Sequence, residues 1–270
     1  MRSFCVALYA ACFLSPYYAH AGAWTQGEGN GQIILNAWYY TTDSFYNNSG
    51  TETSQGTYRK YELNPYMEYG LFDGVTIGAN LSLQRASQDV AGGTVTNYGI
   101  GDTELFARFR LWEKYGFIIS AEPLIKLPSP ESSDEIPVLG GEHPDAGLSL
   151  AAGYGFSVLG YHHYADVSAG YRHRFGDPEN QLRYSATVGV TVAPKWVIMP
   201  QAFMTQRTND PAAATFTQSS GDDFDLTKLQ LSAVYKYSDD MSLQFGGFSH
   251  VDGKNTGAGD GALLAVWKTF

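Results

Sequence analysis

The sequence predicts an all-β fold: a transmembrane up-and-down antiparallel β-barrel of twelve strands that follows a cleavable signal peptide. Three observations predict this fold. Apolar and polar residues alternate in segment after segment, and the connections between these segments are short and long in turn. Aromatic residues make up 14% of the chain and charged residues only 16%. Beyond the N-terminus, no apolar run reaches the roughly 18 residues that suggest a membrane-spanning helix.

The N-terminus has the features of a secretory signal peptide. A short basic start, Met1-Arg2-Ser3, precedes an apolar run over residues 4–14, and Ala19-His20-Ala21 fits a signal-peptidase site. We therefore expect residues 1–21 to be removed and residues 22–270 to form one barrel domain.

Both cysteines, Cys5 and Cys12, lie in this leader, so we expect no disulfide framework in the mature chain. Lipoprotein cleavage before Cys12 is the alternative. It is disfavoured because Tyr9 occupies a position that takes a small aliphatic residue.

Alternation with a period of two defines the strands, because successive side chains of a strand point to opposite faces of the sheet. In residues 60–69, apolar residues at odd positions alternate with mostly polar residues at even positions. Similar alternation recurs in residues 75–84, 102–111, 182–192 and 228–237. The twelve expected strands cover about residues 31–42, 57–70, 74–85, 98–112, 117–127, 145–154, 160–175, 181–193, 196–207, 224–238, 241–252 and 261–270.

The connections differ in length at the two ends of the barrel. The short ones lie near residues 70–73, 113–116, 155–159, 194–195 and 238–240. The long ones are residues 43–56, 86–97, 128–144, 208–223 and 253–260, with 176–180 as a short exception. Tight turns at one end and long loops at the other are typical of outer-membrane barrels. An even number of strands also places both chain ends on the short-turn side.

A soluble β-sandwich also alternates and turns at regular intervals, so it is the alternative fold. Segments of about 10–15 residues suit tilted membrane strands better than sandwich strands, which have about five or six. Aromatic residues also crowd the short-turn ends, where an interfacial girdle would lie. These residues are Tyr69, Phe72, Trp112, Tyr115, Phe117, Tyr154, Phe156, Tyr161, Trp196 and Tyr237.

The first and last strands must pair with each other, because hydrocarbon offers no partner for a free sheet edge. The first strand has apolar residues on both faces, and we assign Ile33, Leu35, Ala37 and Tyr39 to the lipid side.

The last strand resembles the assembly signal of outer-membrane barrels, with Leu264, Val266 and the terminal Phe270 on one face. This resemblance implies the barrel-assembly machinery as a partner. Lys268 departs from the pattern, since an aromatic or apolar residue is usual there, but its ammonium group could reach the headgroups.

The net charge of −10 argues against a nucleic-acid binder. Many acidic residues gather in or beside the long connections: Glu131, Asp134, Glu135, Glu142, Asp145, Asp210, Asp222, Asp223, Asp252 and Asp260. Other charges fall on the polar faces of strands and should point inward, because a basic side chain facing lipid at mid-bilayer costs about 2–4 kcal/mol. The expected lumen-lining charges are Lys60, Glu62, Glu68, Asp102, Glu104, Arg108, Arg110, Glu122, Lys126, Asp166, Arg172, Arg174, Arg183, Arg207, Lys228 and Lys236.

This set has ten basic and six acidic residues, so it predicts a net positive pore that favours anions. The alternative is an interior plugged by ion pairs, because Asp102, Glu104, Arg108 and Arg110 share one face of one strand. Twelve strands lie between filled barrels of eight and open porins of sixteen, so barrel size leaves both interpretations open.

Catalytic motifs are lacking in the sequence. His162 and His163 are adjacent in a strand and point to opposite faces, so they cannot share a metal ion, and the neighbours Ser249 and His250 are separated in the same way. We find no zinc-ligand spacing, phosphate-binding loop or G-x-S-x-G motif. We predict no enzyme, no catalytic residue, no cofactor and no metal.

Three sequence blocks carry a resemblance to a known family: EYGLFDGVTIG (residues 68–78), GIGDTELFARFRL (residues 99–111) and AEPLIKLP (residues 121–128). Their order resembles the proteobacterial outer-membrane barrels associated with the meta-pathway of phenol degradation, which are regarded as transporters of hydrophobic or aromatic compounds. The resemblance covers residues 65–130, and the remainder agrees only in strand rhythm. The opening AWTQ (residues 23–26) also resembles small barrels linked with exopolysaccharide export and adhesion.

We therefore predict a monomeric channel in the outer membrane of a Gram-negative bacterium, for passive passage of small solutes that are aromatic, hydrophobic or anionic. Its selectivity would come from Arg108, Arg110, Lys126, Arg172, Arg174 and Arg183. Its other partners would be outer-membrane lipid and lipopolysaccharide. One alternative is a structural, export or adhesion barrel that acts through acidic extracellular loops. Another is a lateral route for hydrophobic molecules through the wall at Pro123 or Pro200, since proline removes a ladder donor.

Overall fold

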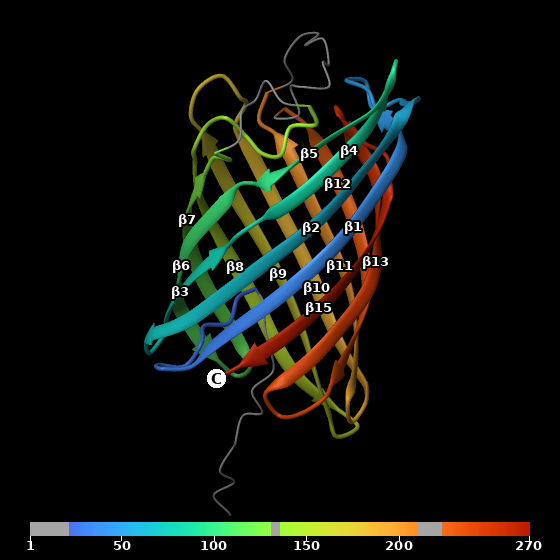
Figure 1. Cartoon of the computed structure of the whole chain (residues 1–270). Helices are drawn as coiled ribbons and strands as arrows, with labels where there is room; N and C mark the ends of the chain where they lie inside the picture. Colours follow the sequence, from blue (N-terminus) through green and yellow to red (C-terminus); the bar gives the residue numbers. More distant parts are fainter. Residues whose placement is uncertain (1–21, 131–135, 210–222) are drawn as a thin grey trace, which may run out of the picture.

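The computed structural model describes residues 22–130, 136–209 and 223–270 as one closed antiparallel β-barrel (Figure 1). Its strands are β1 (Gly31–Tyr46), β2 (Glu52–Phe72), β3 (Val75–Asn80), β4 (Leu83–Val90), β5 (Gly93–Ile100), β6 (Thr103–Lys114), β7 (Phe117–Leu127), β8 (Asp145–Val158), β9 (Tyr161–Arg174), β10 (Gln181–Ala193), β11 (Trp196–Arg207), β12 (Asp225–Lys236), β13 (Met241–Lys254), β14 (Thr256–Gly257) and β15 (Asp260–Thr269).

Within the described ranges, the structure contains no helix that is long and apolar enough to cross a membrane.

The predicted twelve-stranded barrel is confirmed. Strands β3 and β4 form one barrel strand with a short break, because both pair with β2. Strands β5 and β6 form the next one, since β5 pairs with β4 and β6 with β3. The sheet closes where β15 pairs with β1, from Gln32 opposite Thr269 to Thr41 opposite Asp260. The last strand therefore pairs with the first, as the exclusion of free edges from lipid requires.

Three of the expected long connections are shorter than predicted. The one over residues 253–260 contains β14 and the ends of β13 and β15. Strand β1 continues to Tyr46 and β2 begins at Glu52, so the connection expected over residues 43–56 lies mostly in strands. Strands β4 and β5 continue to a two-residue turn at Ala91-Gly92, inside the connection expected over residues 86–97. These hairpin ends lack a continuous apolar face, so backbone pairing continues where the alternation signal has ended.

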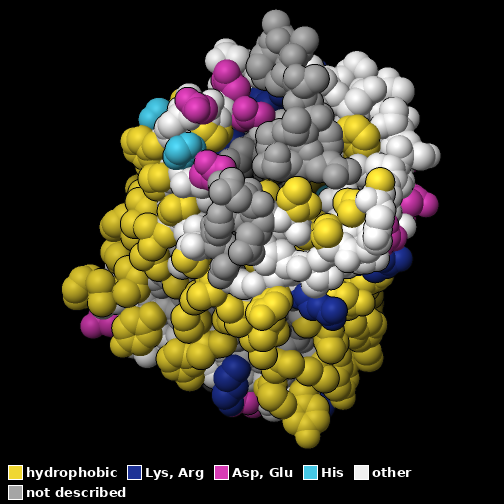
Figure 2. Space-filling model, turned by 45° about the horizontal axis from the view of Figure 1, so that its top comes forward, with side chains coloured by type: hydrophobic (Ala, Val, Ile, Leu, Met, Phe, Trp, Pro, Cys, Tyr) yellow, Lys and Arg dark blue, Asp and Glu magenta, His cyan; other side chains and the backbone are white. Residues whose placement is uncertain are grey.

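The two faces of the barrel wall differ as the alternation predicts. Leu63, Ile77 and Leu231 face outward and are 38%, 42% and 59% exposed. In β1, Ile33 and Leu35 are 39% and 42% exposed while Ile34 is 6% exposed, which confirms the assignment of that strand. Figure 2 shows hydrophobic side chains covering the wall below the loops, with several acidic side chains among the loops.

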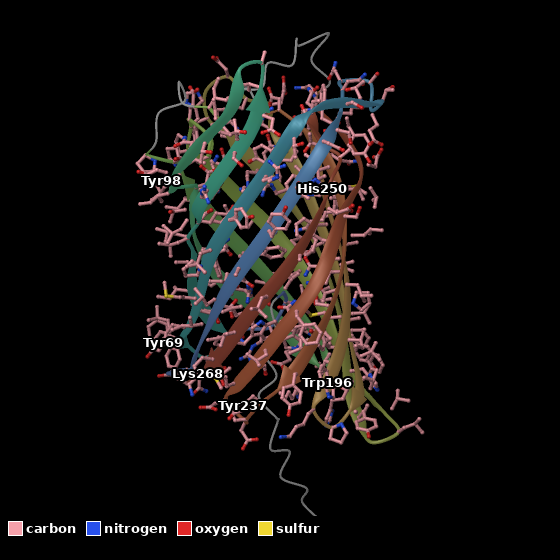
Figure 3. The ribbon with its side chains drawn as sticks, turned by 45° about the vertical axis from the view of Figure 1, so that its right-hand side comes forward. Tyr69, Tyr98, Trp196, Tyr237, His250 and Lys268 are labelled. Carbon is pink, nitrogen blue, oxygen red and sulfur yellow. The ribbon has the colours of Figure 1, made fainter. Side chains whose placement is uncertain are left out.

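Aromatic residues mark the short-turn end of the barrel, as expected for an interfacial girdle. Tyr69, Trp196 and Tyr237 lie near this end in Figure 3, and all three are at least 37% exposed. Lys268 lies at the same end, and its ammonium group pairs with the carboxylate of Asp240 in the β12–β13 turn. This hydrogen bond holds the pKa of Asp240 below its usual value.

Replacing Leu231, at the middle of β12, with arginine tests the lipid-facing assignment. Leu231→Arg is expected to lower the free energy of unfolding by about 2–4 kcal/mol, because it places a charge against lipid near the bilayer midplane. Urea titration in lipid vesicles measures this change. Leu111 is equally exposed but near a turn, so Leu111→Arg is the matched control, with an expected loss of about 0–1 kcal/mol. Equal effects of the two changes would contradict the assignment.

Candidate functional site in the barrel lumen

The segment before β1 lies inside the barrel, in the half next to the short turns (Figure 1). Ala23 is fully buried against Ile118 and Ala151. Trp24 lies beside Gly153 on β8, where an added Cβ would meet the indole ring at 2.6 Å. Its ring also meets Tyr164 edge-on, with the ring centroids 5.8 Å apart. This segment therefore fills part of the bore.

Hydrogen bonds hold this N-terminal segment against several strands. The carbonyl oxygen of Ala23 accepts a hydrogen bond from the Ser120 hydroxyl on β7. The backbone N–H of Gln26 donates to Thr76 Oγ1 on β3 at 2.7 Å, and its side-chain amide donates to Glu68 Oε2 at 2.8 Å. Because β2, β3 and β7 all contribute, the segment is fixed to several strands of one part of the wall.

Arg108 is the centre of the charged network around this segment. Its guanidinium pairs with Glu68 on β2 and with Glu122 on β7, both at 2.7 Å. It also donates to the carbonyl oxygen of Trp24 at 2.8 Å. Arg108 and Glu68 are 3% and 2% exposed, so their pairing takes place away from bulk water. Tyr66 donates its hydroxyl to Glu68 and completes the group.

A second charged network surrounds Asp145, near the loop end. Asp145 is 2% exposed and lies 3.3 Å from the ammonium group of Lys126. Arg172 and Arg174 lie 3.8 and 3.7 Å from the same carboxylate. The remaining pairs of this region join Lys126 to Asp102, Arg172 to Glu104, Arg174 to Asp223 and Arg207 to Asp225.

These networks show how the charges expected in the lumen pair with one another. Most of the basic residues expected in the lumen lie inside, but acidic residues neutralise them. Asp145, which the sequence analysis listed among the acidic residues in or beside the long connections, belongs to this interior, and Asp223 and Asp225 add two further partners. Arg110 differs again: it pairs with Asp73 and Glu113, whose side chains are 83% and 51% exposed, so it belongs to the rim at the short turns.

The loop-end half of the lumen encloses a cavity of about 930 Å³. One side is aromatic: Trp38 and Phe248 meet edge-on with centroids 5.4 Å apart, and Tyr40 stacks on Phe248 at 6.2 Å. The Lys228 ammonium group lies 5.0 Å from the Trp38 ring centroid, 4.5 Å from that of Phe203 and 5.3 Å from that of Phe248. Such cation–π contacts hold an ammonium group without neutralising its charge.

Lys228 and Arg183 are the uncompensated cations of this cavity. In the part of the chain that the structure describes, neither has a carboxylate within ion-pair distance, and Arg183 contacts Gln181 Oε1 at 2.9 Å instead. Lys60 also lines the cavity but pairs with Glu62 at 2.9 Å. The cavity thus combines aromatic surface with two positive charges that have no acidic partner.

The other predicted site residues lie elsewhere. Lys236 does not line the cavity, and Asp166 is buried beside Gly22. Of the acidic loop residues, Glu131, Asp134, Glu135, Asp210 and Asp222 lie outside the described residues, as does the expected signal peptide, residues 1–21.

Sequence reasoning missed the aromatic part of the site. Trp38 and Tyr40 alternate with the lipid-facing residues of β1, and Phe203 and Phe248 occupy inward positions on β11 and β13. The alternation places these residues on the inward face, but aromatic residues also occur on the lipid-facing side of a strand, so their inward position alone did not indicate a site. Only the strand order β1-β15-β13-β12-β11 in the sheet brings these rings around Lys228.

The wall is irregular at both prolines proposed for a lateral route. Residue pairing between β6 and β7 skips from Phe106–Leu124 to Phe109–Ala121, beside Pro123. Pairing between β10 and β11 skips in the same way beside Pro200. Neither proline lines the cavity, so the geometry favours the lumen over these wall positions as the solute site.

Two of the histidines have hydrogen-bonding contacts with a hydroxyl group and a backbone carbonyl group. His162 Nδ1 contacts the Ser157 hydroxyl at 2.8 Å, and His250, near the loop end in Figure 3, contacts the Gly257 carbonyl oxygen at 2.9 Å. Within the described ranges, no group of three or more His, Cys, Asp or Glu residues is placed to hold a metal ion. The absence of enzymatic activity stays a prediction.

The sequence matches no protein-family model and no curated protein. The fold is similar to that of an outer membrane channel from Pseudomonas putida F1, with a TM-score of 0.71 and 18% identity, over 94% of this chain and 100% of that one. The NanC and KdgM porins are each 10% identical with TM-scores of 0.52, over 87% and 88% of this chain and 98% and 99% of theirs. At these identities the likeness concerns the fold, which is the outer-membrane barrel that the alternation predicted.

Proposed function

We propose that this protein is an outer-membrane channel for the passive passage of small solutes. The observation that carries this proposal is the cavity of about 930 Å³ inside the loop-end half of a closed barrel. The outward apolar face suits lipid, and the enclosed face supplies polar and aromatic contacts for a solute. The barrel folds of known outer-membrane channels and porins support the same conclusion. Movement would be diffusion down a gradient, past the N-terminal segment.

The solutes that the cavity suits best are small aromatic anions. Trp38, Phe203 and Phe248 offer ring faces and edges to a planar solute, and Lys228 and Arg183 offer charge to an anionic group. A carboxylate would gain a charge-assisted hydrogen bond without breaking an existing ion pair. The proposal narrows the predicted solutes, which were aromatic, hydrophobic or anionic, to those that are both aromatic and anionic. The other cations expected to select anions are already in ion pairs.

The outward face of the barrel indicates the membrane and the partners of the protein. We propose a monomer in the outer membrane of a Gram-negative bacterium, in contact with lipid and lipopolysaccharide. Leu264 and Val266 on the outer face of β15 are exposed, as is Phe270, which follows β15, so all three are open to the barrel-assembly machinery. The cavity supports passage of a solute more directly than an export or adhesion role through the acidic loops.

Binding of an aromatic carboxylate tests the solute class. We expect benzoate to quench tryptophan fluorescence of the protein in detergent micelles, and Lys228→Gln to weaken its apparent affinity about tenfold, as loss of one charged hydrogen bond implies. Lys195 lies in the exposed β10–β11 turn, so Lys195→Gln is the matched control and should leave the affinity unchanged. Equal affinity in both variants, or weaker binding of benzoate than of neutral benzamide, would contradict the assignment.

A further inference from the structure

Asp166 is a buried carboxylate without a partner. Its side chain points into the lumen from β9, and the residue is only 4% exposed. Asp166 Oδ2 has no hydrogen-bond partner among the described residues. Asp166 is one of eight charged residues that are buried among the described residues, and the seven others form ion pairs. These seven are Glu68, Arg108, Lys126, Asp145, Arg172, Arg174 and Arg207.

An unpaired buried carboxylate is unfavourable, because its ionised form loses hydration and gains no ion pair in return. Arg108 is the cation whose charge acts on Asp166, but its guanidinium is already paired with Glu68 and Glu122. The exception at Asp166 therefore points to a cation that the unprocessed chain does not present. The other half of the lumen cannot supply one, since Lys228 is surrounded by aromatic rings and Arg183 lines the loop-end cavity.

Gly22, the first residue that the structure describes, lies beside the Asp166 carboxylate. A Cβ built on Gly22 would lie 2.5 Å from Asp166 Oδ1 and 3.2 Å from Oδ2. From standard bond lengths, the backbone nitrogen of Gly22 then lies within about 5 Å of the carboxylate. Gly22 also has a φ of 107°, which favours glycine. A side chain at this position would therefore meet both backbone strain and the carboxylate.

The expected signal-peptidase site supplies the missing charge. Hydrolysis of the Ala21–Gly22 peptide bond adds the water oxygen to the Ala21 carbonyl carbon and leaves the nitrogen on Gly22. That nitrogen is a neutral amide before cleavage, and after it takes up a proton it is an α-ammonium group with three donors. We infer that Asp166 binds the α-ammonium group created at Gly22 by removal of the signal peptide. This ion pair anchors the N-terminal segment in the lumen.

The inference rests on cleavage after Ala21, and it is independent of which solute crosses the barrel. It gives proteolytic processing a structural consequence: only the mature chain offers Asp166 a cationic partner. Residues 23–26 follow directly from the anchor and reach Ser120, Arg108 and Thr76. The anchor and these hydrogen bonds would act together to fix the segment.

Labelling of the N-terminal amine tests this site. Mass spectrometry of the protein purified from membranes should give Gly22 as the first residue. 2-Pyridinecarboxaldehyde, which reacts selectively with a free α-amine, should label the folded protein at least about tenfold more slowly than the SDS-unfolded protein, because the amine is buried in an ion pair. Asp166→Asn should remove most of this protection. Glu62→Gln changes another lumen carboxylate, which is paired with Lys60, and should leave the protection of the α-amine from labelling unchanged.

A second variant keeps the test decisive if Asp166→Asn does not fold. Inserting Gly-Ser between Ala21 and Gly22 leaves Asp166 intact but moves the α-amine two residues away, so labelling of the folded protein should accelerate by a similar factor. A different first residue, or equally fast labelling of the folded and unfolded wild-type protein, would overturn the inference. So would unchanged protection in the insertion variant.

Discussion

Deleting residues 23–28 from the mature chain is expected to raise the single-channel conductance at least about threefold, because the deletion removes the side chains that narrow the bore. Ala23 and Trp24 fill the half of the lumen next to the short turns, opposite the open cavity. The wall itself does not depend on this segment, since β1 begins at Gly31 and pairs with β15 from Gln32. Recordings in planar lipid bilayers measure the change.

Trp24→Ala is a smaller change to the same segment and should have a smaller effect on conductance. It removes the indole ring beside Gly153 but keeps the backbone contact between the Trp24 carbonyl oxygen and Arg108. Its conductance should therefore lie between those of the wild type and the deletion. An unchanged conductance in the deletion, in protein that still shows the heat-modifiable gel migration of a folded barrel, would mean that this segment does not limit passage.

Replacing Arg108 with methionine is expected to lower the free energy of unfolding by about 3–5 kcal/mol, because Glu68 is left buried without its cation. Glu122 loses a partner as well. Arg110 is two residues away on the same strand, but its partners are exposed, so Arg110→Met is the matched control with an expected loss of at most about 1 kcal/mol. Equilibrium unfolding in vesicles, followed by tryptophan fluorescence, measures both changes.

A double variant separates charge burial from packing at Arg108. Combining Arg108→Met with Glu68→Gln removes the cation together with one of the carboxylates that it neutralises. The double variant should recover much of the stability lost in Arg108→Met, because contacting members of one network are not additive. No recovery would assign the loss to packing or to Glu122 instead.

The sequence is sufficient to predict which way each strand faces. Leu63, Ile77 and Leu231 lie outside as predicted, because alternation is a local property of the chain and lipid requires one continuous apolar face. Closure of the sheet follows from the same physics, since a free edge cannot remain in hydrocarbon.

The contents of the lumen could not be predicted in the same way, because they depend on register and on contacts between distant residues. Arg108 meets Glu68 and Glu122 only because β2 and β7 hold those carboxylates around it. The N-terminal segment shows no alternation, so nothing in its pattern indicates that Trp24 lies inside the barrel. Asp145 lies beside a long connection, at the start of the expected strand 145–154, and alternation alone does not show that this first residue of β8 is buried among three basic side chains.

The most direct test of the proposed channel is a bilayer recording of the mature wild-type protein. We expect discrete current steps with a preference for anions, and we expect benzoate to reduce the current by occupying the cavity beside Lys228. Folded protein that inserts into the bilayer but carries no current and passes no solute would contradict the proposal of a passive channel.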